Sequence, residues 1–118
     1  MSQVFVLQEM QGHDYSAAEH YGELVFIGTK DINSRFPIIG TPGNREVIKN
    51  MFAILNLFED GDYIVISGNP VIVSLALHFL IVIRNNSKVR LLKWDNRALG
   101  YCVLDYPGID FGTFFLGG

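Results

Sequence analysis

The segment 63–84 constrains the fold of this chain more than any other part of the sequence. Its first four residues, 63–66, are apolar and predict a buried strand. Asn69 has the side chain of a helix N-cap, and Pro70 suits the first position of a helix. The apolar residues that follow predict a helix that runs to the end of the segment and is covered on nearly every side. Because another apolar run, 89–94, predicts a strand directly after this helix, we expect the two strands to be parallel neighbours.

Two more strands are predicted near the N-terminus, by the apolar runs 4–7 and 24–27. Between them, Ser16 and Glu19 have the spacing of a capping box, in which the serine hydroxyl and the glutamate side chain each bond a free backbone amide. This spacing predicts a short helix that begins at the serine.

The stretch 29–44 holds two prolines and two glycines and predicts a long surface loop. Asn44 at its end is expected to cap a helix whose apolar residues share one face. Toward the C-terminus, a turn at 95–97 joins the strand at 89–94 to a last strand at 100–104. Together these elements predict a small three-layer Rossmann-like α/β sandwich, with a mostly parallel sheet and a C-terminal β-hairpin at its edge.

The composition fits one folded domain. Of 118 residues, 49% are hydrophobic and 18% are charged, which excludes an intrinsically disordered chain. The formal net charge of −3 argues against a protein that coats nucleic acid, because such binding depends on a basic surface. We expect residues 1–106 to form the domain and residues 107–118 to form a glycine-rich, aromatic tail. Such a tail is expected either to pack on its own domain or to dock on another subunit or protein partner, through Phe111, Phe114, Phe115 and Leu116.

Cys102 is the single cysteine of the chain, so neither an intrachain disulfide nor a site of several thiolates is expected. Its apolar neighbours predict an inert, buried thiol. The apolar run 71–83 is too short to span a membrane and predicts a core helix in which His78 is buried with its hydrogen bonds satisfied. The N-terminus lacks the basic start of a signal peptide, which indicates a cytoplasmic protein.

Ligands of open α/β sheets bind outside the carboxyl ends of parallel strands. The strands at 4–7, 63–66 and 89–94 are expected to end at one such edge. The residues that follow them or end them form a candidate ligand-binding set: Glu9, His13, Asp14, Ser67, Gly68, Asn69, Trp94 and Asp95.

The turn 67–69 precedes a helix, and free backbone amides at a helix start suit a phosphate group. The alternative is that Gly68 fits a turn and Asn69 caps the helix. His13 beside Asp14 suggests a general base for weak hydrolysis, and the alternative is a loop pair with no catalytic task.

The remaining signals for chemistry are incomplete. Trp94 lies near Lys93 and Arg97 and is suited to stacking on a base, although a single aromatic residue in an acidic protein more often packs or anchors a sheet edge. Ser67 lacks the glycine spacing of a hydrolase nucleophile, and the three histidines lack the spacing of metal ligands. We therefore assign no catalytic residue, no cofactor and no metal ion from the sequence.

Three segments taken together resemble small uncharacterised proteins of tailed bacteriophages and related mobile elements. They are HDYSAAEHYGELV (13–25), DYIVISGNP (62–70) and LLKWD (91–95). The resemblance implies an origin, with a place in the host cytoplasm or in the virion, and carries no mechanism.

These observations leave three hypotheses for the function. The first is a non-enzymatic accessory protein that binds a protein partner or forms a homo-oligomer through its tail. The second is a binding protein for a nucleotide or another phosphate-bearing small molecule at the strand edge. The third is a structural protein of the virion, which the sequence does not separate from the first.

Overall fold

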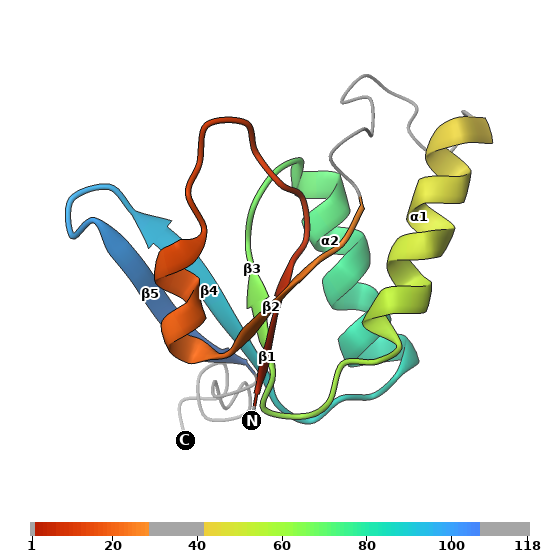
Figure 1. The fold of residues 1–118 in the computed structure, drawn as a ribbon. Coiled ribbons are helices and arrows are strands. Elements are labelled where there is room, and N and C mark those ends of the chain that lie inside the picture. The colour runs from red at the N-terminus through yellow and green to blue at the C-terminus, as the bar shows by residue number, and fades with distance from the viewer. Residues whose placement is uncertain (1, 29–41, 107–118) are drawn as a thin grey trace, which may run out of the picture.

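The computed structural model describes residues 2–28 and 42–106 (Figure 1). The elements follow one another in the expected order. They are β1 (Gln3–Val6), the 3-10 helix η1 (Ser16–Tyr21), β2 (Glu23–Phe26), α1 (Pro42–Leu55), β3 (Tyr63–Val65), α2 (Pro70–His78), the π-helix η2 (Phe79–Ile83), β4 (Val89–Asp95) and β5 (Gly100–Tyr106).

The strands form one sheet in the order β2-β1-β3-β4-β5. The first four strands are parallel, and β5 runs antiparallel to β4. This arrangement confirms a small α/β fold with a mostly parallel sheet and a C-terminal hairpin at its edge. From β1 the chain moves outward to β2 and then returns to β3 on the other side of β1, so the direction of strand order reverses between β1 and β3.

Helices α1 and α2 cover one face of the sheet, and η1 lies over the other (Figure 1). Successive residues of a strand point to opposite faces. In β1, Phe5 therefore packs under the two α-helices, whereas Val4 and Val6 pack toward η1, and all three are fully buried. A strand buried on both faces is the reason why its sequence is a continuous apolar run and not an alternating one.

Local hydrogen bonds fix the ends of both long helices. Asn69 caps α2 as expected, because its Oδ1 accepts a bond from the Val71 amide at 2.9 Å. At the other end, Arg84 follows η2 and donates through Nη1 to the carbonyl groups of Leu55 and Phe58. Arg84 thereby bonds carbonyls at and just after the end of α1 and ties the two helical segments together.

Two aspartates join the loops at the amino end of the sheet. The buried Asp62 carboxylate accepts bonds from the amides of Gln3, at 3.0 Å, and Glu59, at 2.9 Å. Asp60 accepts bonds from the side chains of Ser87 and Asn86 in the loop before β4. The bonds from these two side chains lower the pKa of Asp60 to about 2.

The short helix begins at Ser16 as predicted, but the capping box predicted there and the N-cap predicted at Asn44 were wrong. The Ser16 side chain does not cap η1; instead Asp14 Oδ1 accepts the bond from the Ser16 amide at 2.9 Å. A carboxylate two residues earlier thus replaces the capping box, and the turn that follows is a 3-10 helix. Helix α1 begins at Pro42, which suits a first turn because proline has no amide to leave unpaired, so Asn44 lies inside the helix.

The expectation that the helix after Pro70 is covered on nearly every side was also wrong. His78 is exposed, and Val82 and Ile83 in η2 are 61% and 63% exposed. Helix α2 lies in an outer layer, with the sheet beneath it and α1 along one flank, and no other described element covers its outer side (Figure 1). Hydrophobicity alone does not reveal which side of an apolar helix lacks a neighbour.

Candidate functional site

The carboxyl ends of β1, β3 and β4 lie at one edge of the sheet. The strand registers place Val6 beside Val65, and Val65 beside Leu92. The residues after β1, those after β3 and the end of β4 therefore meet at this edge. The parallel arrangement on which the candidate ligand-binding set depends is confirmed, whereas ligand binding by these residues stays a prediction.

A network of hydroxyl groups occupies the point where the strand order reverses, between β1 and β3. Ser67 Oγ donates to the carbonyl of Gln8 at 2.6 Å and lies 2.8 Å from the Tyr15 hydroxyl. The Tyr15 hydroxyl accepts from the Met10 amide at 2.7 Å, and both Ser67 and the Gln8 carbonyl, 3.3 Å away, lie within reach of its proton. Tyr15 is only 5% exposed, so Ser67 is held by a structural network.

The side chain of Gln8 occupies the turn that begins α2. Its Oε1 accepts a bond from the Asn69 amide at 2.7 Å, while Asn69 in turn accepts from the Val71 amide. Gly68 has φ +94°, and a Cβ at this position would collide with the Gln8 amide group. These bonds favour the view that Gly68 fits a turn and Asn69 caps a helix, because the amides of Asn69 and Val71 are already satisfied within the protein.

His13 lies in a cluster of aromatic rings beside this network. Its Nε2 is 3.0 Å from the Tyr101 hydroxyl, and its ring meets those of Tyr15 and Trp94 edge to face, with centroids 4.5 and 5.1 Å apart. Burial raises the pKa of Tyr101 to about 12, with further contributions from the charges of Tyr15 and Asp14. The Tyr101 hydroxyl therefore keeps its proton at neutral pH and fixes the position of the imidazole.

His13 and Asp14 are directed toward different partners. The exposed Asp14 carboxylate accepts the bond from the Ser16 amide, and this bond lowers the pKa of Asp14. Orientation of His13 comes from Tyr101 instead, across 88 residues of sequence. This geometry favours a loop pair over a general base aligned by its neighbouring carboxylate. Glu9 is exposed at the same edge.

A cavity of about 400 Å³ lies at the hairpin between β4 and β5, lined by Lys93, Trp94, Asp95, Asn96, Arg97 and Cys102. The indole nitrogen of Trp94 donates to Asn96 Oδ1 at 2.9 Å, and Asp95 Oδ1 accepts from the Arg97 amide at 2.9 Å. These bonds fix the turn, and the Lys93 side chain at the same cavity is exposed.

Cys102 is exposed, so the prediction of a buried thiol was wrong. Its strand, β5, is the edge of the sheet, and its register partner Lys93 is exposed as well. The thiol points to Asp95 Oδ2 at 3.8 Å. The apolar neighbours of Cys102 in the sequence are thus edge-strand residues and not core residues.

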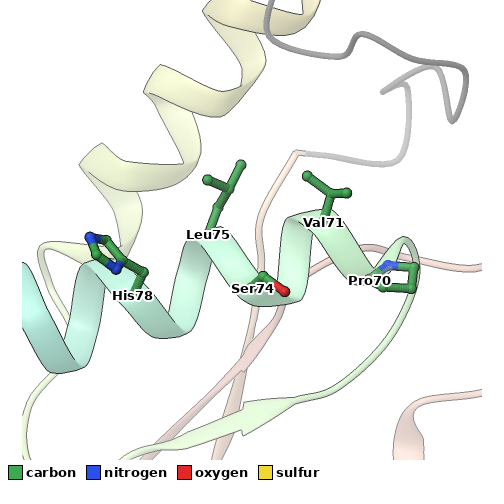
Figure 2. Close-up of a pocket in the computed structure, with 5 residues that line it drawn as sticks. All are labelled: Pro70, Val71, Ser74, Leu75 and His78. Carbon is green, nitrogen blue, oxygen red and sulfur yellow. The ribbon is translucent and has the colours of Figure 1, made fainter.

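An apolar groove of about 550 Å³ runs along α2. Figure 2 shows Val71 and Leu75 on one side of the helix, with Pro70 at its start and the exposed His78 at its end. Ser74 also lines the groove and is exposed. The groove adds no group suited to acid–base chemistry besides this histidine.

The residues that hold the edge together were not among the sequence candidates. Gln8, Tyr15 and Tyr101 make the bonds that position Asn69, Ser67 and His13. A polar residue directly after a buried strand, as at Gln8, is the sequence signal by which this position could have been found. The predicted interface residues Phe111, Phe114, Phe115 and Leu116 lie outside the described residues.

Within the ranges 2–28 and 42–106, no three histidine, cysteine, aspartate or glutamate side chains are grouped as metal ligands. In the same part of the chain, no helix has the length and apolar character needed to cross a membrane.

Residues 2–107 match the model of the family described as Phage Pam3 gp32-like protein. Neither the curated proteins nor the solved structures contain a match.

Proposed function

Since the chain belongs to the Phage Pam3 gp32-like family, we propose that it serves the phage as a non-enzymatic module that associates with itself. The observation that carries this proposal is the strand β5. It lies at the edge of the sheet, and its neighbouring residues Val103 and Leu104 are 46% and 49% exposed. Apolar side chains on an open strand edge favour association with another chain.

The bonds at the carboxyl edge support a module without catalysis. Ser67 is bonded to Gln8 and Tyr15, and His13 to Tyr101, so neither side chain is joined to a carboxylate that would activate it. The tail from residue 107 directly follows β5 in the sequence and adds Phe111, Phe114, Phe115 and Leu116 to the same end of the chain.

Size-exclusion chromatography with light scattering tests this proposal. We expect the full chain to have at least twice the mass of one chain at micromolar concentration. A chain that lacks residues 109–118 separates a contribution of the tail from that of the domain. A single-chain mass for both, up to the highest soluble concentration, would contradict self-association.

The hairpin cavity favours a second candidate function, the binding of a nucleotide or another phosphate-bearing metabolite. Trp94 offers a ring face for a base, and the exposed cations Lys93 and Arg97 suit a phosphate. A thermal-shift screen tests this function, because a ligand at 100 times its dissociation constant adds about 2.7 kcal/mol of stability. The Lys93→Ala/Arg97→Ala variant is the control, since it should lose the shift without loss of the fold.

A structural role in the virion is one form of the proposed self-association, in which the copies of the chain assemble as part of the phage particle. Mass spectrometry of purified particles tests it: the chain is expected at a stoichiometric amount if it builds the virion, and absent if it acts in the host cytoplasm.

A further inference from the structure

We propose that a second copy of this chain pairs with β5 edge to edge, antiparallel, about a two-fold axis at Val103. This inference rests on the proposed self-association and names the surface and the register through which it occurs. The paired strands would join two five-stranded sheets into one continuous sheet.

The hydrogen bonds of β4 show which backbone groups of β5 face outward. The Arg90 amide donates to Asp62 at 3.2 Å, and the Leu92 carbonyl accepts from the Ile66 amide at 2.9 Å. The backbone groups of Arg90 and Leu92 thus point toward β3. Because the backbone groups of successive residues alternate in direction, the residues next to them in β4 point toward β5.

In the β4–β5 register, Leu91 pairs with Leu104, and Lys93 pairs with Cys102. The backbone groups of Leu104 and Cys102 therefore point inward, to β4. Among the described strands none lies on the outer side of β5, and three residues direct their amides and carbonyls to that side: Tyr101, Val103 and Asp105.

This edge lacks the features that usually prevent pairing with another strand. Edge strands are commonly short or carry proline, lysine or unpaired charges. The other edge of the sheet, β2, has only four residues and begins with the exposed Glu23. By contrast, β5 has seven residues and contains neither proline nor lysine, and its one charged residue, Asp105, pairs with Arg90 at 3.6 Å.

The sequence of β5 is compatible with itself in this register. Pairing about Val103, the middle residue of the strand, overlaps all seven residues and brings each outward-facing residue opposite another one. Tyr101 then lies opposite the partner's Asp105, and Cys102 opposite the partner's Leu104. No like charges oppose each other, and the exposed side chains of Val103 and Leu104 become covered. These features favour a second copy over an unrelated strand.

A charge at the axis tests the surface. Val103→Lys places two ammonium groups opposite each other in the pair, and we expect it to weaken dimerisation at least tenfold by light scattering. Val82→Lys is the matched control, because Val82 is 61% exposed on η2, away from β5, and should leave the mass unchanged. Equal dimerisation of Val103→Lys and the native chain would overturn the proposal.

Cross-linking tests the register. In a Cys102→Ser background, Val103→Cys brings two thiols together at the axis, at a spacing that suits a disulfide, and should give a covalent dimer on oxidation. Leu104→Cys in the same background is the control and should cross-link much more slowly, because its partner position is a serine. A dimer whose Val103→Cys form does not cross-link would overturn this register and leave the proposed self-association standing. A native chain that remains monomeric would overturn both.

Discussion

Replacement of Gly68 by alanine tests the idea that the Gln8 side chain fills the turn before α2 and bonds the Asn69 amide. Gly68 has φ +94°, and its missing Cβ leaves the space that the Gln8 side chain fills. Gly61 is the matched control, because its φ of +95° is nearly the same and a Cβ there would contact nothing within 4 Å. The two substitutions thus share the backbone penalty and differ only in the contact with Gln8.

The shared penalty of a positive φ for alanine is about 1–3 kcal/mol. In Gly68→Ala the new methyl group must also displace Gln8, whose Oε1 accepts the Asn69 amide bond at 2.7 Å. Loss of a partner for a partly buried amide costs roughly a further 1–3 kcal/mol. Gly68→Ala should therefore destabilise the protein by about 2 kcal/mol more than Gly61→Ala.

Urea unfolding followed by the fluorescence of Trp94, the single tryptophan, measures this difference. With a slope of about 2 kcal/mol per molar urea, the midpoint of Gly68→Ala should lie roughly 1 M below that of Gly61→Ala. Equal midpoints for the two variants would show that the contact between Gln8 and the turn contributes nothing to stability, and would refute the role given to Gln8 at the start of α2.

Two further predictions concern the aspartates at the opposite end of the sheet. Asp62→Ala leaves the amides of Gln3 and Glu59 without their acceptor and should lower the free energy of unfolding by about 2–4 kcal/mol. Asp62→Asn keeps one acceptor oxygen and should lower it less. Equal losses in the two variants would contradict this account. The second prediction concerns Asp60, whose pKa is lowered to about 2 by its bonds to the loop before β4. The ionised carboxylate therefore stabilises the folded state fully above pH 4, and this stabilisation is lost as the pH falls toward 2. Urea midpoints between pH 2 and 5 should thus depend less on pH in Asp60→Asn, and an unchanged dependence would count against the bonds to the loop before β4.

Local chemistry explains which elements the sequence predicted well. Strand β3, the Asn69 cap and the start of α2 at Pro70 each depend on residues next to one another in the sequence, and all three occur as expected. The parallel pairing of β3 with β4 followed from the strand–helix–strand order alone. Competing local bonds misled the prediction at Ser16, where Asp14 accepts the Ser16 amide that the capping box assigned to the Glu19 side chain.

Burial was harder to predict, because it depends on which elements lie over a residue. Cys102 and His78 stand in apolar runs, yet in the described part of the chain β5 is an edge strand and no element covers the outer side of α2, so both side chains are exposed there. The bonds that close the carboxyl edge were equally hidden, because Gln8 and Asn69 are 61 residues apart, and Tyr15 and Ser67 are 52 apart.

The same bonds decide where a phosphate-bearing ligand would bind, if the second candidate function holds. At the start of α2 such a ligand must displace Gln8 from the Asn69 amide, at a cost of roughly 1–3 kcal/mol before any gain. At the hairpin, Lys93 and Arg97 are exposed and need no such displacement. A ligand-induced thermal shift should therefore survive in Gln8→Ala, which frees the Asn69 amide, and disappear in Lys93→Ala/Arg97→Ala. The reverse pattern would move the site to the helix start and show that the Gln8 bond yields to ligands.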